Sequence, residues 1–340
     1  MSIALFKPTI KRKDMDSVLT CLVSDQIGPS ALADDLIATI SSELGTHGGC
    51  ALREFPRALS LLLDTLELQR GDKVILSPLA PQAYSRVFAE KGIVPLYADV
   101  TEEKGAMDPE KIVPLMEEEP KAIFAVHTMG FIQPMEELGR FGLPLIEDIS
   151  QSLGAQLKEE EAGSWGQYVL LGMESHHIIT SGGGALLLGR SEEETGLLDE
   201  KCSELCVESF LPDMNGSLGL VQWSQLEGFL EKRRQLAELF NRSSSRGRHS
   251  SFRPEEGEEP SWYAYPLYLK DSMKEIRQYA RKKGVETAMA FGGTCIDFME
   301  DRSLCPVASR LAMGTLLFPL YPMMGQKNGE LISRVLTTLP

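Results

Sequence analysis

The chain alternates between amphipathic segments and short runs of consecutive apolar residues. In segment 11–24, Met15, Leu19 and Leu22 recur at helical spacing and share one face. The run 73–77, which follows a Gly-Asp turn and contains β-branched residues, is typical of a buried strand. The pattern therefore predicts an α/β protein in which helices and strands follow one another along the chain.

The predicted helices are separated by glycine, proline and polar turns. They span 11–24, 31–44, 58–68, 81–91, 109–118, 134–141, 218–241, 272–283, 307–313 and 329–336. The predicted strands span 73–77, 94–100, 122–126, 143–148, 169–172, 185–188 and 263–269. Strands that alternate with helices favour a mostly parallel sheet that is covered on both faces.

Polar residues end three of the predicted strands. They are Asp99, His127 and Asp148. Ligands of such sheets bind beyond the carboxyl ends of the strands, so a site is expected at that edge. Farther along, the polar linkers 243–248 and 255–260 predict a division into a large domain, 1–242, and a small C-terminal α+β domain, 243–340.

Charge and composition exclude several classes of function. The 340 residues carry a net charge of −15, which argues against a nucleic-acid binder because a phosphate backbone requires basic surface. No apolar run reaches the roughly 18–20 residues of a membrane span. Residues 1–8 lack the pattern of a secretion signal, so the expected location is the cytoplasm.

Two further groups of residues have ordinary interpretations. The six scattered cysteines fit reduced thiols, and Cys202 and Cys206 lack the second ligand pair of a metal site, so no metal is expected. The charged run 231–234, near the end of a predicted helix, is interpreted as a solvated face.

Several segments keep a characteristic order along almost the whole chain. They are 66–72 (LELQRGD), 92–100 (GIVPLYADV), 143–155 (LPLIEDISQSLGA), 218–234 (LGLVQWSQLEGFLEKRR) and 318–322 (FPLYP). Together they resemble the DegT/DnrJ family of sugar aminotransferases that depend on pyridoxal phosphate (PLP). The resemblance implies the PLP-dependent transferase fold type I, with a mostly parallel seven-stranded sheet and a small C-terminal α+β domain. It also implies a homodimer with sites near the subunit interface.

The resemblance assigns two cofactor-binding positions to the polar residues after one strand. Asp148 matches the carboxylate that pairs with the pyridine nitrogen and keeps the ring protonated. Gln151 matches the residue near the 3-oxygen of the ring. An alternative interpretation is that both polar groups cap the turn that follows the strand.

The position of the family's Schiff-base lysine falls on a histidine. Counting back from Gly183 places it on His176, and counting forward from Gly166 places it on His177. Imidazole has no primary amine to condense with an aldehyde, so a histidine could act there only as a proton-transfer base. One branch of the family, the sugar 3-dehydratases, uses a histidine in this way. Alternatively, the pair forms only local hydrogen bonds.

The family's phosphate-binding turn aligns with 54–56, Glu-Phe-Pro. Proline has no backbone N–H, and a glutamate repels a phosphate. Arg53 and Arg57 flank this turn and could bind an anion, or could be surface arginines at the start of a helix. The family's ring-stacking aromatic residue aligns with Pro81.

Three functional hypotheses remain open from the sequence. The first is an aminotransferase-like protein of nucleotide-sugar or polysaccharide metabolism that lacks ordinary transaminase activity and has a binding, regulatory or scaffolding role. The second is a sugar 3-dehydratase that uses PLP or pyridoxamine phosphate (PMP), held noncovalently, with His176 or His177 as base. The third is an active sugar aminotransferase whose lysine lies elsewhere. In each case, the expected ligand is a small molecule such as a nucleotide sugar.

Overall fold

A seven-stranded mixed sheet organises the computed structural model, which describes residues 2–340. Its strand order is β1-β9-β8-β5-β4-β2-β3. The strands are β1 (Gly48–Leu52), β2 (Lys73–Leu76), β3 (Val94–Tyr97), β4 (Ile123–Val126), β5 (Leu145–Asp148), β8 (Tyr168–Gly172) and β9 (Ala185–Gly189). Only β9 is antiparallel to its neighbours, β1 and β8. The predicted α/β class and its mostly parallel sheet are confirmed.

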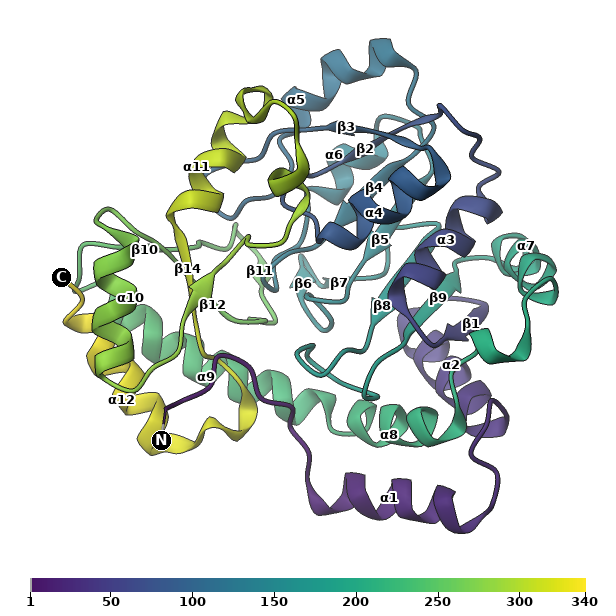
Figure 1. The fold of residues 1–340 in the computed structure, drawn as a ribbon, viewed down its shortest axis with the longest axis horizontal. Helices are drawn as coiled ribbons and strands as arrows, with labels where there is room; N and C mark the ends of the chain where they lie inside the picture. The colour runs from purple at the N-terminus through teal and green to yellow at the C-terminus, as the bar shows by residue number, and fades with distance from the viewer. Residues whose placement is uncertain (1) are drawn as a thin grey trace.

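Helices cover both faces of this sheet (Figure 1). They are α1 (Arg12–Val23), α2 (Ala31–Leu44), α3 (Phe55–Thr65), α4 (Gln82–Lys91), α5 (Pro109–Ile112), α6 (Met135–Gly139), α7 (Glu192–Ser203), α8 (Asp213–Trp223) and α9 (Leu226–Ser244). Alternate strand residues point to opposite faces. In β2, Ile75 joins the core that contains α2, whereas Val74 and Leu76 join the core that contains α3 and α4.

A second, antiparallel sheet lies to one side of the large sheet (Figure 1). Its strands, in order, are β10 (Ser250–Ser251), β12 (Tyr265–Tyr268), β14 (Thr315–Phe318) and β13 (Ala288–Met289). The helices around it are α10 (Met273–Lys282), α11 (Pro306–Gly314) and α12 (Gly325–Thr337). A third, small sheet joins β11 (Glu258–Glu259), β6 (Gln156–Leu157) and β7 (Glu160–Glu161). The boundary after residue 242 stays a prediction.

The N-terminal segment also reaches the second sheet's region. Ile3 forms an isolated parallel bridge to Val285, with its N–H donating to the Gly284 carbonyl over 2.8 Å. The chain then returns to α1, which packs against α8 at the side of the molecule (Figure 1). The segment 2–6 therefore contacts the region of the second sheet before the chain enters α1 beside the large sheet.

The single helix predicted over 218–241 is wrong, because the structure has two helices, α8 and α9. Ser224 and Gln225 separate them, and Gln225 has φ −111° and ψ 0°. The buried Asp14 of α1 stabilises this junction, since its Oδ1 accepts from Gln222 Nε2 at 2.5 Å and from Gln225 Nε2 at 3.2 Å. The sequence analysis also missed β1.

The prediction of a solvated charged run over 231–234 is wrong for Arg233. Its side chain is buried, and Nη1 donates to the carbonyls of Trp262, Tyr263 and Leu320 at 2.8–3.0 Å. Burial lowers the pKa of the guanidinium to about 10. Arg233 therefore joins α9 to two distant loops, and this role cannot be read from the local pattern of charges.

Over residues 2–340, no helix combines the length and apolar character needed to cross a bilayer. The same residues contain no cluster of three or more His, Cys, Asp or Glu side chains arranged to hold a metal ion.

Candidate functional site

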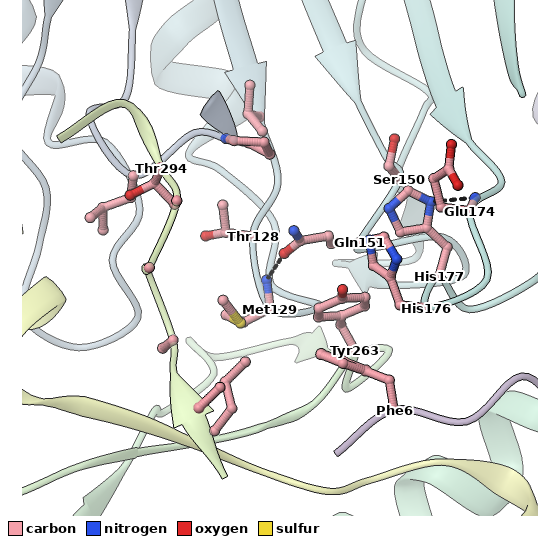
Figure 2. Close-up of a pocket in the computed structure, with 18 of the residues that line it drawn as sticks. Phe6, Thr128, Met129, Ser150, Gln151, Glu174, His176, His177, Tyr263 and Thr294 are labelled. Carbon is pink, nitrogen blue, oxygen red and sulfur yellow. Dashed lines mark hydrogen bonds between the residues drawn. The ribbon is translucent and has the colours of Figure 1, made fainter. Parts of the chain in front are cut away.

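A cavity of about 560 Å³ lies at the carboxyl ends of β4 and β5, where the large sheet faces β13 and β14 (Figure 2). The N-terminal segment forms part of its wall. The lining residues are Leu5, Phe6, Phe55, Leu79, Pro81, Ala83, Val126, His127, Thr128, Met129, Asp148, Ser150, Gln151, Glu174, His176, His177, Tyr263, Ala288, Met289, Ala290, Gly292, Gly293, Thr294 and Leu317. The cavity thus occupies the edge of the sheet at which the sequence predicts a site.

Asp148 ends β5 and is almost completely buried at the cavity wall. Its Oδ1 accepts from the Ser150 N–H at 2.9 Å and from the Ser150 hydroxyl at 2.5 Å, and its Oδ2 accepts from the Tyr84 hydroxyl at 2.8 Å. Burial raises the pKa of Asp148, although the bonds from Ser150 and Tyr84 act in the opposite direction. Each carboxylate oxygen therefore has a donor within the protein.

Gln151 lies beside Asp148 and anchors the loop after β4. Its Oε1 accepts from the Met129 N–H at 3.0 Å, which holds Met129 in a left-handed conformation with φ +58° (Figure 2). Its amide nitrogen forms no hydrogen bond with residues 2–340 in the structure. This nitrogen and the Thr128 hydroxyl are uncharged polar groups that a ligand could contact.

His176 and His177 both line the cavity, in the irregular segment between β8 and β9. His177 is half-buried, and its Nδ1 lies 2.7 Å from the Gly172 carbonyl oxygen and 3.1 Å from the backbone nitrogen of Glu174. Desolvation, together with the neighbouring His176, lowers the pKa of His177 to about 3. Both the base role and the local hydrogen-bonding role predicted for this pair remain compatible with these positions.

Aromatic side chains surround His176. The Phe6 ring lies 5.9 Å from the His176 ring and 5.2 Å from the Tyr263 ring, between centroids (Figure 2). Desolvation by these neighbours lowers the pKa of His176, and the Glu174 carboxylate partly opposes that change. Phe6 and Tyr263 were not identified from the sequence, because their approach to the histidines requires the N-terminal segment to cross the cavity wall.

The predicted anion-binding arginines lie elsewhere. Arg53 and Arg57 are exposed and are not among the lining residues. They flank the start of α3, where Pro56 removes one backbone donor and the N–H groups of Arg57 and Ala58 already donate to the Glu54 carbonyl. The turn that aligns with the family's phosphate-binding turn is therefore an ordinary start of a helix.

The charge of the cavity is unfavourable for a phosphate group. Its lining, drawn from residues 2–340, contains two carboxylates, Asp148 and Glu174, and neither lysine nor arginine. A phosphate at such a site would be repelled by the carboxylates without a cation to offset them. An amine that could form an internal aldimine is also lacking among the lining residues. The lining residues therefore supply neither an amine for an aldimine nor a cation for the cofactor phosphate, although Asp148 lies at the cavity wall where the resemblance places the partner of the pyridine nitrogen.

His127 and Asp99, the other two polar residues predicted at strand ends, form hydrogen bonds within the protein. The His127 Nε2 lies 3.0 Å from Glu147 Oε1, and its Nδ1 accepts from the Gln133 N–H at 3.0 Å. Asp99 caps α11, accepting from the N–H groups of Val307 and Ala308 at 3.0 and 2.9 Å. His127 reaches the cavity wall, whereas Asp99 does not line it.

Tyr84 is the main cavity-associated residue that the sequence analysis missed. It is fully buried in α4, and its ring packs against those of Phe55, Phe88 and Phe124 at centroid distances of 5.8–6.0 Å. Its four-residue spacing from Phe88 marks the buried face of a helix. The partner of its hydroxyl, Asp148, could not be found from that spacing.

Two known proteins that act on GDP-linked sugars are similar to this chain in sequence. The sequence is 26% identical to the GDP-4-keto-6-deoxy-D-mannose 3-dehydratase of Yersinia pseudotuberculosis, over 66% of this chain and 65% of that protein, which is just under two thirds of its length. It is 21% identical to the GDP-perosamine synthase of Vibrio cholerae, over 70% of each chain.

The fold is that of known aminotransferase structures. The crystal structure of the aminotransferase TlmJ from Streptoalloteichus hindustanus superposes with a TM-score of 0.91 at 20% identity, over 98% of each chain. This likeness confirms the fold type that the sequence resemblance implies. The sequence model of the DegT/DnrJ/EryC1/StrS aminotransferase family matches residues 8–339, and the chain belongs to that family.

Proposed function

We propose that this protein binds a nucleotide-linked sugar in the cavity and does not carry out transamination through a lysine-bound PLP. The observation that supports this proposal is the composition of the cavity lining. It combines His176 and His177 with the carboxylates of Asp148 and Glu174 and has no cation from residues 2–340. Such a lining disfavours a phosphorylated cofactor and leaves room for an uncharged ring.

The remaining lining groups suit a sugar. Thr128 and the Gln151 amide offer hydrogen bonds to hydroxyl groups, while Phe6, Met129 and Tyr263 supply apolar surface. The relatives named above point to the same ligand class, because one is a GDP-keto-sugar dehydratase and another is a GDP-perosamine synthase. We place the protein's role in nucleotide-sugar or polysaccharide metabolism, and we expect a homodimer, which light scattering on the 37.6 kDa chain would test.

The decisive experiment is a cofactor test on the purified protein. It is incubated with PLP or PMP, freed of unbound cofactor, and examined by visible absorbance before and after borohydride. We expect no retained cofactor and no reducible aldimine, together with measurable binding of a GDP-sugar by calorimetry. A reducible band would overturn the proposal in favour of an active aminotransferase.

A sugar 3-dehydratase is the second candidate, and one observation favours it. His176 and His177 line the same cavity as Asp148, so a ring nitrogen of this pair could accept a proton from a ligand bound there. This candidate requires retention of PLP or PMP without a reducible aldimine, and loss of turnover of a GDP-4-keto-6-deoxy sugar in His176→Asn or His177→Asn. Absence of PMP retention would exclude it.

A further inference from the structure

A second depression adjoins the cavity on the side of the N-terminal segment. It has a volume of about 960 Å³ and is lined by Ser2, Leu5, Met273, Lys274, Arg277, Gln278, Arg281, Val285, Glu286 and Thr287. Leu5 lines both depressions. Residues 285–287 of this groove continue directly into β13, which forms part of the cavity wall. The groove and the cavity therefore meet at the N-terminal segment.

Three cations of α10 point to the groove. Lys274, Arg277 and Arg281 are spaced by three and four residues, so they share one face of the helix, whereas Ile276 and Ala280 are buried on another. All three cations are exposed. Within residues 2–340, none of them forms an ion pair or a side-chain hydrogen bond in the structure.

The charge of this groove is opposite to that of the chain. The whole sequence has 49 acidic and 34 basic residues, but the groove lining has three cations and one carboxylate, that of Glu286. The Ser2 hydroxyl donates to Glu286 Oε1 at 2.7 Å. A positive groove on an acidic protein concentrates anions locally.

We propose that this groove binds the diphosphate of the nucleotide-linked ligand whose sugar lies in the cavity. This inference rests on the proposed function. The cavity carboxylates would repel a diphosphate, so the neutralising cations must come from outside it. Arginine side chains at Arg277 and Arg281 can each bind phosphate oxygens through two N–H groups, and Lys274 adds a third positive charge.

Calorimetric titration of the full chain with inorganic pyrophosphate tests the groove by itself. The variant Lys274→Gln/Arg277→Gln/Arg281→Gln should bind pyrophosphate at least tenfold more weakly than the wild type. The matched control Lys232→Gln/Arg242→Gln/Arg246→Gln removes the same charge from exposed positions on and just after α9 and should bind as the wild type does. No binding to the wild type, or equal weakening in both variants, would overturn the proposal.

Titration with GDP-mannose separates this inference from the proposed function. Thr128→Val in the cavity should weaken GDP-mannose binding and leave pyrophosphate binding unchanged. If Thr128→Val changes neither, while the groove variant still loses pyrophosphate, the cavity proposal fails and the anion site stands. If Thr128→Val weakens GDP-mannose binding but the groove variant matches the control for both ligands, the groove assignment fails alone.

Discussion

The Tyr84 hydroxyl donates a hydrogen bond to Asp148 Oδ2 over 2.8 Å, joining the buried face of α4 to the end of β5. Both side chains are buried, and the two residues are 64 positions apart in the sequence. The bond stabilises the ionised carboxylate, whose other oxygen accepts from Ser150. The fold therefore supports this carboxylate without requiring a positively charged ligand beside it.

Tyr84→Phe should destabilise the protein by about 1–3 kcal/mol at pH 7, because it removes a hydrogen bond to a buried charged group. Since Tyr84 lowers the pKa of Asp148, that pKa should rise in the variant. The loss should shrink as the pH falls and Asp148 becomes protonated. Urea unfolding at pH 7 and pH 4 measures both effects. The control Tyr279→Phe removes an exposed hydroxyl that contacts Thr338, and should change stability little.

His177→Gln should make stability less dependent on pH below neutrality. Folding lowers the pKa of His177 to about 3 from an ordinary value near 6.5, so the unfolded chain binds a proton that the folded chain does not. Stability is therefore lost as the pH falls from about 6.5 toward 3, by roughly 2 kcal/mol at pH 5. Urea unfolding at pH 7 and pH 5 should show a smaller difference in the variant. An unchanged difference, or an equal change in the exposed His47→Gln control, would contradict the assignment.

Arg233→Met should lower the free energy of unfolding by about 3 kcal/mol or more, because three buried carbonyl oxygens lose their charged donor. The neighbouring Arg234→Met is a matched control. Its exposed ion pairs with Glu227 and Glu231 contribute about 1 kcal/mol at most. Thermal unfolding of the two variants would measure the contrast. Similar melting temperatures would argue against the structural role of Arg233.

Gly172→Ala should disturb the histidine side of the cavity. A Cβ at this position would lie 2.8 Å from His177 Cε1 and 3.1 Å from Ser150 Oγ, so the ring must move. We expect a loss of about 1–3 kcal/mol and altered His177 ring resonances in NMR spectra. Gly139→Ala in α6, where nothing lies within 4 Å of the added carbon, should be neutral or stabilising by up to about 1 kcal/mol.

The sequence predicted the elements whose periodicity is strong. Segment 31–44 coincides with α2, and 94–100 contains β3 at its start. The short edge strand β1 was missed, because two glycines open it and its apolar stretch is brief. The break between α8 and α9 was missed because it depends on Asp14, which lies about 210 residues earlier in the chain.

The candidate site was predicted in part. Asp148, Gln151, His176 and His177 line one cavity, as the family resemblance implies for the cofactor positions. Their chemical roles stay predictions. The sequence suggested Arg53 and Arg57 as anion ligands. In the structure both are exposed near the start of α3, and neither lines the cavity. The sequence analysis predicted the helix 272–283 but did not identify the basic face of α10.

By itself, the sequence determined the fold class, the family and the carboxyl-end edge at which polar residues gather. These follow from short-range periodicity and from the order of segments along the chain. Only the tertiary structure decided that Tyr84 supports Asp148, that Arg233 is buried, and that Leu5 lines both an acidic cavity and a basic groove. Such relationships join residues far apart in sequence, and the burial and charge that they create depend on packing that no local pattern encodes.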